Sequence, residues 1–156
     1  MDKLSFKKAE KKDAAILAEY RFKMFNDIFP EDNLGERKAE IVEKCTRYYL
    51  DDLDNKNHYS IIVFIDMTAV GCGTILFEER PPSPRHKKNL HAYILNIYVD
   101  AEHRSKGIAK KIMELLHEYA RSKNVRRIGL HASRFGCGLY KKMGYKTNES
   151  YLELEL

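Results

Sequence analysis

The segment Tyr93–Ser133 constrains the fold most, because it contains a buried strand, an amphipathic helix and a second strand in direct succession. The run Tyr93–Val99 is apolar on both alternating faces except at Asn96, which predicts a central strand covered on both sides. Ile108–Arg121 then places apolar side chains on one helical face and charged side chains opposite. Since Val125–Ser133 is again a strand, this order predicts a parallel crossover and a mixed α/β fold.

Shorter elements surround this unit, and no Gly/Ser linker, repeat or low-complexity tract divides the chain. We therefore expect one domain over residues 1–156. Period-2 and period-3.6 patterns predict the other elements. Before the central strand these are a strand at Leu4–Phe6, a helix that begins at Asp13, and a second helix that begins with a capping box at Asn33 and Glu36 and runs towards Leu53. A hairpin of Tyr59–Ile65 and Ala69–Glu78 follows, and then an exposed loop at Arg80–Lys88. After the crossover we expect a short helix at Phe135–Met143 and a final strand at Tyr151–Leu156.

Positive charge is concentrated in the last third of the chain. The net charge is +5, yet residues 1–100 hold 16 Lys and Arg against 17 Asp and Glu, whereas residues 101–156 hold 12 against 6. Such a cluster suits a nucleic acid, an anionic surface or a phosphorylated small ligand, and composition does not choose among the three. The choice among these three kinds of ligand therefore depends on local sequence motifs.

The cysteines and the hydropathy pattern bear on the compartment. Cys45, Cys72 and Cys137 are too few and too far apart for a disulfide framework, and no CxxC pair offers metal-ligand spacing. No apolar run reaches the about 18 residues of a membrane span, and the N-terminal region holds no signal-peptide core. We expect a cytoplasmic protein with no membrane partner and no metal site.

The junction between the central strand and the following helix has the chemistry of an anion site. The first N–H groups of a helix have no internal partner and the helix dipole adds about half a positive charge, so an anion is stabilised there. Gly107 lets a ligand approach the backbone, while Arg104, Lys106 and Lys110 add cationic side chains. A phosphate group is the ligand that this turn favours.

Residues 104–109 resemble the acetyl-CoA motif of the GNAT superfamily of N-acetyltransferases, which is Arg or Gln, two residues, Gly, one residue, and Gly or Ala. Two further segments extend the resemblance in the family's order, Asn96–Asp100 before the motif and Leu139–Tyr145 after the next strand. Three elements in order are far more specific than one six-residue pattern. The resemblance implies the GNAT fold, in which a mixed, mostly antiparallel sheet flanked by helices has a central strand that bulges and splays from its neighbour.

The resemblance also implies where acetyl-CoA lies. Ile97 and Val99 are expected to bind the pantetheine arm through their backbone, and a free N–H at Ile97 or Tyr98 to stabilise the carbonyl oxygen. Ser133 stands where the family often has an asparagine that contacts pantetheine. Tyr140 matches the tyrosine that donates a proton to the departing thiolate. The residues expected around the pyrophosphate are Arg104, Ser105, Lys106, Gly107, Ile108, Ala109 and Lys110.

Acetylation of an amine needs a base, because a lysine-like amine with a pKa of about 10.4 is protonated at neutral pH. By strand placement the candidates are Glu78, His91 and, as a residue that positions a water, Asn96. No cysteine stands in a nucleophile motif, so we expect direct attack within a ternary complex. The expected acceptor is a primary amine on a small molecule, an amino-acid derivative or a protein.

Several residues, the function and the oligomeric state also allow other interpretations. Met24–Phe25 and Tyr48–Tyr49 lie on amphipathic helices and are interpreted as core, and His131 as a residue on the solvent or ligand face of its strand. An alternative function is an acetyl-CoA sensor without turnover, in which Tyr140 only packs. A nucleic-acid-binding domain is a third, although interleaved exposed aromatics are missing. Pairing through Tyr151–Leu156 is compatible with a homodimer, and a monomer fits equally well.

Overall fold

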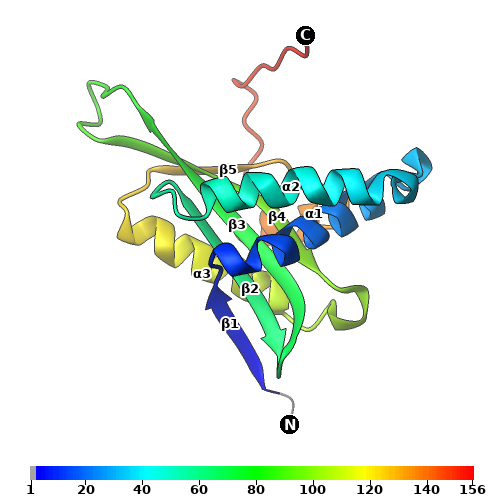
Figure 1. Ribbon diagram of the computed structural model, residues 1–156. Helices are drawn as coiled ribbons and strands as arrows, with labels where there is room; N and C mark the ends of the chain where they lie inside the picture. The colour runs from blue at the N-terminus through cyan, green and yellow to red at the C-terminus, as the bar shows by residue number, and fades with distance from the viewer. Residues whose placement is uncertain (1–2) are drawn as a thin grey trace.

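A five-stranded sheet runs through the middle of the molecule, with helices on both faces (Figure 1). The computed structural model describes residues 3–156. The strands lie in the order β1–β2–β3–β4–β5; β1 to β4 are antiparallel, and β5 is parallel to β4. This mixed α/β architecture and the β4–α3–β5 crossover confirm the predicted fold. The bounds are Leu4–Lys8 (β1), Ala14–Ile28 (α1), Lys38–Asp52 (α2), His58–Ile65 (β2), Thr68–Arg80 (β3), Asn89–Val99 (β4), Ile108–Ser122 (α3), Arg127–Leu130 (β5) and Cys137–Lys142 (α4).

Alternation along the strands fills two apolar cores, one on each face of the sheet. Val63 of β2 packs in the core that holds Ile112 of α3. Its neighbour Ile62 points the other way and packs with Leu17 of α1 and Tyr49 of α2. All five side chains are almost completely buried. Because apolar burial is the main stabilising contribution, both helix layers are held to the sheet by these cores. Of the helices in residues 3–156, none combines the length and apolar character that crossing a membrane takes.

A bulge interrupts β4 where it faces β3. The register shifts between Cys72 and Thr74, so that Asn96 and Ile97 together oppose Gly73. Asn96 has a φ of 56°, the left-handed backbone that the first residue of such a bulge often adopts. The extra residue bends the strand, as the resemblance implied.

β5 separates from β4 close to this bulge. The last pair of the parallel ladder joins Ile94 to Leu130, whereas β4 continues to Val99. Within residues 3–156 no strand pairs with β4 on that side beyond Ile94. The predicted splay is therefore present, and it leaves the backbone of the second half of β4 free along one edge.

The C-terminal segment differs from its prediction. Tyr151–Leu156 was expected to form a strand but has no strand pairing, and Leu152 and Leu154 are 90% and 81% exposed. Figure 1 shows this segment leading away from the body of the molecule. Alternating apolar residues specify which side chains share a face, but a strand also needs a partner for its backbone groups.

Helix and strand ends also differ in places. Asn33 has a φ of 48° and its side chain makes no capping bond, so the predicted capping box is wrong; α2 begins at Lys38 after a 3-10 turn at Leu34–Arg37. A capping residue normally has extended backbone, which this left-handed conformation excludes. β5 is shorter than Val125–Ser133 because its partner strand diverges.

We expect Gly73→Ala to destabilise the fold by about 1–3 kcal/mol, the usual cost of overpacking a core. A Cβ there would lie 2.4 Å from Ile112 Cγ2 and 2.7 Å from Ile97 Cδ1. Gly129→Ala in β5 is the matched control, since its Cβ would meet only the Tyr93 ring, at 3.8 Å. Denaturant unfolding of both variants measures the difference, and equal midpoints would contradict the close packing over Gly73.

Candidate active site

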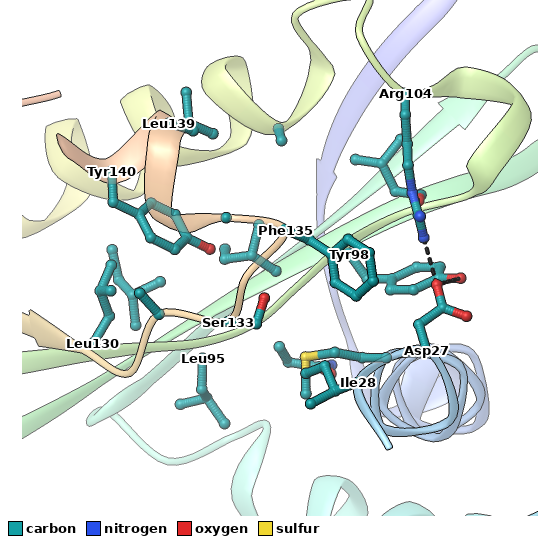
Figure 2. A pocket seen from close by; sticks show the side chains of 18 of the residues that line it. Asp27, Ile28, Leu95, Tyr98, Arg104, Leu130, Ser133, Phe135, Leu139 and Tyr140 are labelled. Carbon is teal, nitrogen blue, oxygen red and sulfur yellow. Dashed lines mark hydrogen bonds and ion pairs between the residues drawn. The ribbon is translucent and has the colours of Figure 1, made fainter. Parts of the chain in front are cut away.

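A cavity of about 910 Å³ lies where β4 and β5 separate. Its walls come from α1, β4, the turn before α3, the residues after β5, and α4, so both helix layers contribute (Figure 2). Lys106 is the one predicted acetyl-CoA residue that does not line it. The residues that do are Ile97, Tyr98, Val99, Arg104, Ser105, Gly107, Ile108, Ala109, Lys110, Ser133 and Tyr140.

The turn before α3 has left-handed backbone at two positions that line the cavity. Ser105 and Gly107 have φ values of 61° and 80°, and the helix begins at Ile108. No side chain caps this end and its first turn holds no acidic residue. The N–H groups and the positive end of the helix dipole are therefore available to an anion.

The Arg104 guanidinium is occupied by the protein itself. It donates to Asp27 Oδ2 at 2.6 Å and, through Nε, to the Val99 carbonyl at 2.8 Å; Figure 2 shows the ion pair as a dashed line. The Tyr98 hydroxyl donates to the same carboxylate oxygen at 3.1 Å. Burial and the charge of Asp27 raise the pKa of Tyr98 to about 12. Arg104 thus connects the turn before α3 to α1, a partner that the sequence pattern did not indicate.

Tyr140 packs against the core but directs its hydroxyl into the cavity (Figure 2). Within residues 3–156 this hydroxyl makes no hydrogen bond, and burial raises the pKa of Tyr140. The ring lies against Gly136, where a Cβ would come within 2.6 Å of it. The side chain is therefore held in place and stays protonated at neutral pH, as a proton donor must.

The three base candidates from the sequence occupy different places. Glu78 and His91 face each other across β3 and β4 and do not line the cavity. Asn96 lines it and is 2% exposed. Its Nδ2 donates to the Leu17 carbonyl of α1 at 3.3 Å, and its buried Oδ1 has no partner within residues 3–156. Asn96 therefore connects the bulge to α1.

A different imidazole lines the cavity beside the splay. His131 directly follows Leu130, the last residue of β5, and its Nδ1 is hydrogen-bonded to the Tyr93 hydroxyl. Both residues line the cavity, and the His131 side chain is 71% exposed. Tyr93 and Leu95 alternate with the core-facing Ile94, so they lie on the face of the sheet that α1 covers.

The α1 wall was missed by the sequence analysis. Met24 and Phe25 were interpreted as core, but they line the cavity and belong to neither core cluster. Of the pair Tyr48–Tyr49, Tyr49 is fully buried and Tyr48 is 44% exposed. The same helical spacing describes a face against a core and a face against a cavity, so periodicity does not distinguish them.

No thiol lines the cavity among the residues that the structure describes. Cys72 is buried, donates to the Asn96 carbonyl at 3.2 Å, and has its pKa raised by burial. Cys45 and Cys137 lie outside the lining. This arrangement offers no cysteine nucleophile to a ligand in the cavity.

Solved structures share this architecture. A predicted acetyltransferase from Clostridium acetobutylicum, crystallised with acetyl-CoA, is 29% identical, with 98% of this chain and 96% of that chain covered and a TM-score of 0.87. A GCN5-related N-acetyltransferase from Ralstonia eutropha JMP134 is 21% identical (98% and 99% covered, TM-score 0.82). A ribosomal-protein-alanine N-acetyltransferase from Brucella melitensis biovar Abortus 2308 is 18% identical (99% of each chain covered, TM-score 0.71). The last two show likeness of fold alone.

The family comparison agrees with the motif and with the cavity around it. The model of the acetyltransferase (GNAT) family matches residues 21–145, which include the C-terminal part of α1, the β4 bulge, the turn before α3 and α4. The matched range covers most of the chain and every residue predicted to bind acetyl-CoA. The chain therefore belongs to the acetyltransferase (GNAT) family.

Proposed function

We propose that this protein transfers the acetyl group of acetyl-CoA to a primary amine by direct attack in a ternary complex. The observation that carries the proposal is the course of the cavity, which joins the N-terminus of α3 to the exposed face of α1 through the gap between β4 and β5. A cofactor entering from the α3 side and an acceptor entering from the α1 side meet at the bulge. Such positioning supplies much of the rate acceleration of a two-substrate reaction.

The proposed binding of acetyl-CoA depends mainly on backbone groups. The uncapped first turn of α3 and the positive-φ Gly107 suit the pyrophosphate, since the amides there are free. The unpaired edge of β4 at Ile97 and Val99 suits the pantetheine amides, and Ser133 lines the opposite wall. Lys110 lies in the first turn of the helix and adds positive charge, with Glu114 at 3.6 Å.

The reaction needs an acid for the departing sulfur. The neutral amine nitrogen attacks the thioester carbon, the C–N bond forms, and the C–S bond breaks with its electron pair leaving on sulfur. The attacking nitrogen releases its second proton as the amide forms, and that proton replaces the one that the acid gives to the sulfur. Tyr140 is the group we assign to protonate that thiolate, because its hydroxyl faces the cavity and remains protonated. The N–H of Ile97 or Tyr98 at the bulge is the donor we assign to the carbonyl oxygen.

The amine must first lose a proton, and we assign its acceptance to His131. Of the bases considered from sequence, Glu78 and His91 lie outside the cavity and the amide of Asn96 is not basic. His131 lines the acceptor side and is oriented by Tyr93. Imidazole is the side chain best suited to take up a proton near neutral pH.

Gly107→Glu should weaken acetyl-CoA binding at least about tenfold, or ~1.4 kcal/mol, because it places a carboxylate at the proposed pyrophosphate position. Calorimetric titration with acetyl-CoA measures the loss. Gly144→Glu is the matched control: both glycines have positive φ and open space around the Cβ position, but only Gly107 lines the cavity. If both variants lose the same affinity, backbone strain rather than the anion site explains the effect.

Tyr140→Phe should keep the fold and the acetyl-CoA affinity but lower kcat about 10²- to 10⁴-fold, since the ring packs while the hydroxyl donates the proton. Steady-state kinetics with an amine panel measure kcat, and thermal unfolding checks the packing. Unchanged kcat would leave Tyr140 with a packing role only, and absence of turnover in the unmodified protein would favour the sensor alternative.

His131→Gln should lower kcat/KM at pH 7 by about 10²-fold or more, because glutamine keeps a polar partner for Tyr93 but takes up no proton. The deficit should shrink as pH rises and the acceptor amine deprotonates by itself. The charged or titratable groups beside His131 are Tyr93 and Glu153, the latter at 3.6 Å. A pH–rate profile tests this, with His86→Gln outside the cavity as control; a deficit independent of pH would contradict the assignment.

A further inference from the structure

One stripe of α1 faces the cavity without a protein partner over it. Arg21, Met24, Phe25 and Ile28 recur at helical spacing and all line the cavity. The three apolar members belong to neither core cluster and are only partly buried. Figure 2 shows Ile28 on this wall, across from Tyr140. The acceptor side of the cavity thus presents an apolar surface that a ligand can cover.

Arg21 is the charged member of this stripe, and it has no anionic partner. Within residues 3–156 its guanidinium forms no ion pair and no hydrogen bond; it lies over the Phe25 ring at 4.8 Å. A guanidinium carries five N–H donors, so a partly buried one without acceptors is incompletely satisfied.

Neighbouring cations are paired, which sets Arg21 apart. Lys23 pairs with Asp100 at 2.9 Å, and Arg104 pairs with Asp27 at 2.6 Å. Among the residues that the structure describes, Asp27 is the only carboxylate that lines the cavity, and Arg104 and Tyr98 already occupy it. An anion that enters from the acceptor side therefore meets one free guanidinium.

We propose that the acceptor is a primary amine that carries an apolar group and a carboxylate, with Arg21 binding the carboxylate and Met24, Phe25 and Ile28 packing on the apolar part. A single guanidinium balances a single charge and matches the two oxygens of a carboxylate in a forked pair. The apolar wall favours a hydrophobic side chain, while the amine points to the gap between the strands. This assignment rests on the proposed acetyl transfer and specifies its substrate class.

The test uses two acceptors of nearly the same shape, L-phenylalanine and L-phenylalaninamide, of which only the first carries a carboxylate. In Arg21→Met the ratio of kcat/KM for acid over amide should fall at least about tenfold, or ~1.4 kcal/mol, relative to the unmodified protein. The intrinsic reactivity of each amine cancels when the ratio is compared between variants. Met preserves helix propensity and apolar cover, so thermal unfolding and acetyl-CoA affinity should not change.

Two further variants sharpen the result. Arg21→Lys should keep part of the preference for the acid over the amide, because lysine retains the positive charge but lacks the two parallel N–H donors of a guanidinium. Arg85→Met, on the exposed loop outside the cavity, should leave the ratio unchanged. The same ratio in Arg21→Met as in the unmodified protein would overturn the assignment of Arg21.

The outcomes separate this inference from the proposed function. If neutral amines are acetylated and phenylalanine is not, acetyl transfer stands and the acceptor class is wrong. If acetyl-CoA binds but no amine in a broad panel is acetylated, the proposed function fails and the acceptor class fails with it.

Discussion

Ile97 and Ile112 close over Gly73, where a single added carbon would lie within 2.7 Å of both. That contact brings α3 against the middle of the sheet, and opposite it β4 accommodates an additional residue at Asn96. The strand bends, its neighbour β5 departs after Ile94, and the cavity opens in the gap. Core packing, the bulge and the cavity are consequently parts of one arrangement, since close-packed interiors transmit a local change to the elements around it.

Two carboxylates then connect α1 to the end of β4 and to the turn before α3. Asp27 accepts from Arg104 and Tyr98, and Asp100 accepts from Tyr20 and from Lys23 of α1. These bonds are partly buried, where charge-assisted hydrogen bonds are stronger than on an open surface. They hold the cavity-lining face of α1 and the turn before α3 in a fixed relative position, which the proposed direct transfer between two bound substrates requires.

Much of the fold could be predicted because its signals are local. The apolar run of β4, the amphipathic face of α3 and the glycine turn between them each depend on near neighbours in the chain, so the crossover and the motif were recognised. Predictions that depended on a strand or residue distant in the chain were wrong at two elements. The strand expected at Tyr151–Leu156 did not form, and Asn33 adopted a left-handed conformation instead of capping α2.

The sequence by itself determined the fold class, the family and the glycine turn before α3, since these reside in periodicity and in a contiguous motif. Only the tertiary structure decided that Arg104 is held by Asp27, that Glu78 and His91 lie away from the cavity, and that the face of α1 carrying Arg21 lines it. The physical reason is that a side chain's partner depends on which elements the fold brings together across the sheet. A pattern along the chain records which face a residue occupies but not what covers that face.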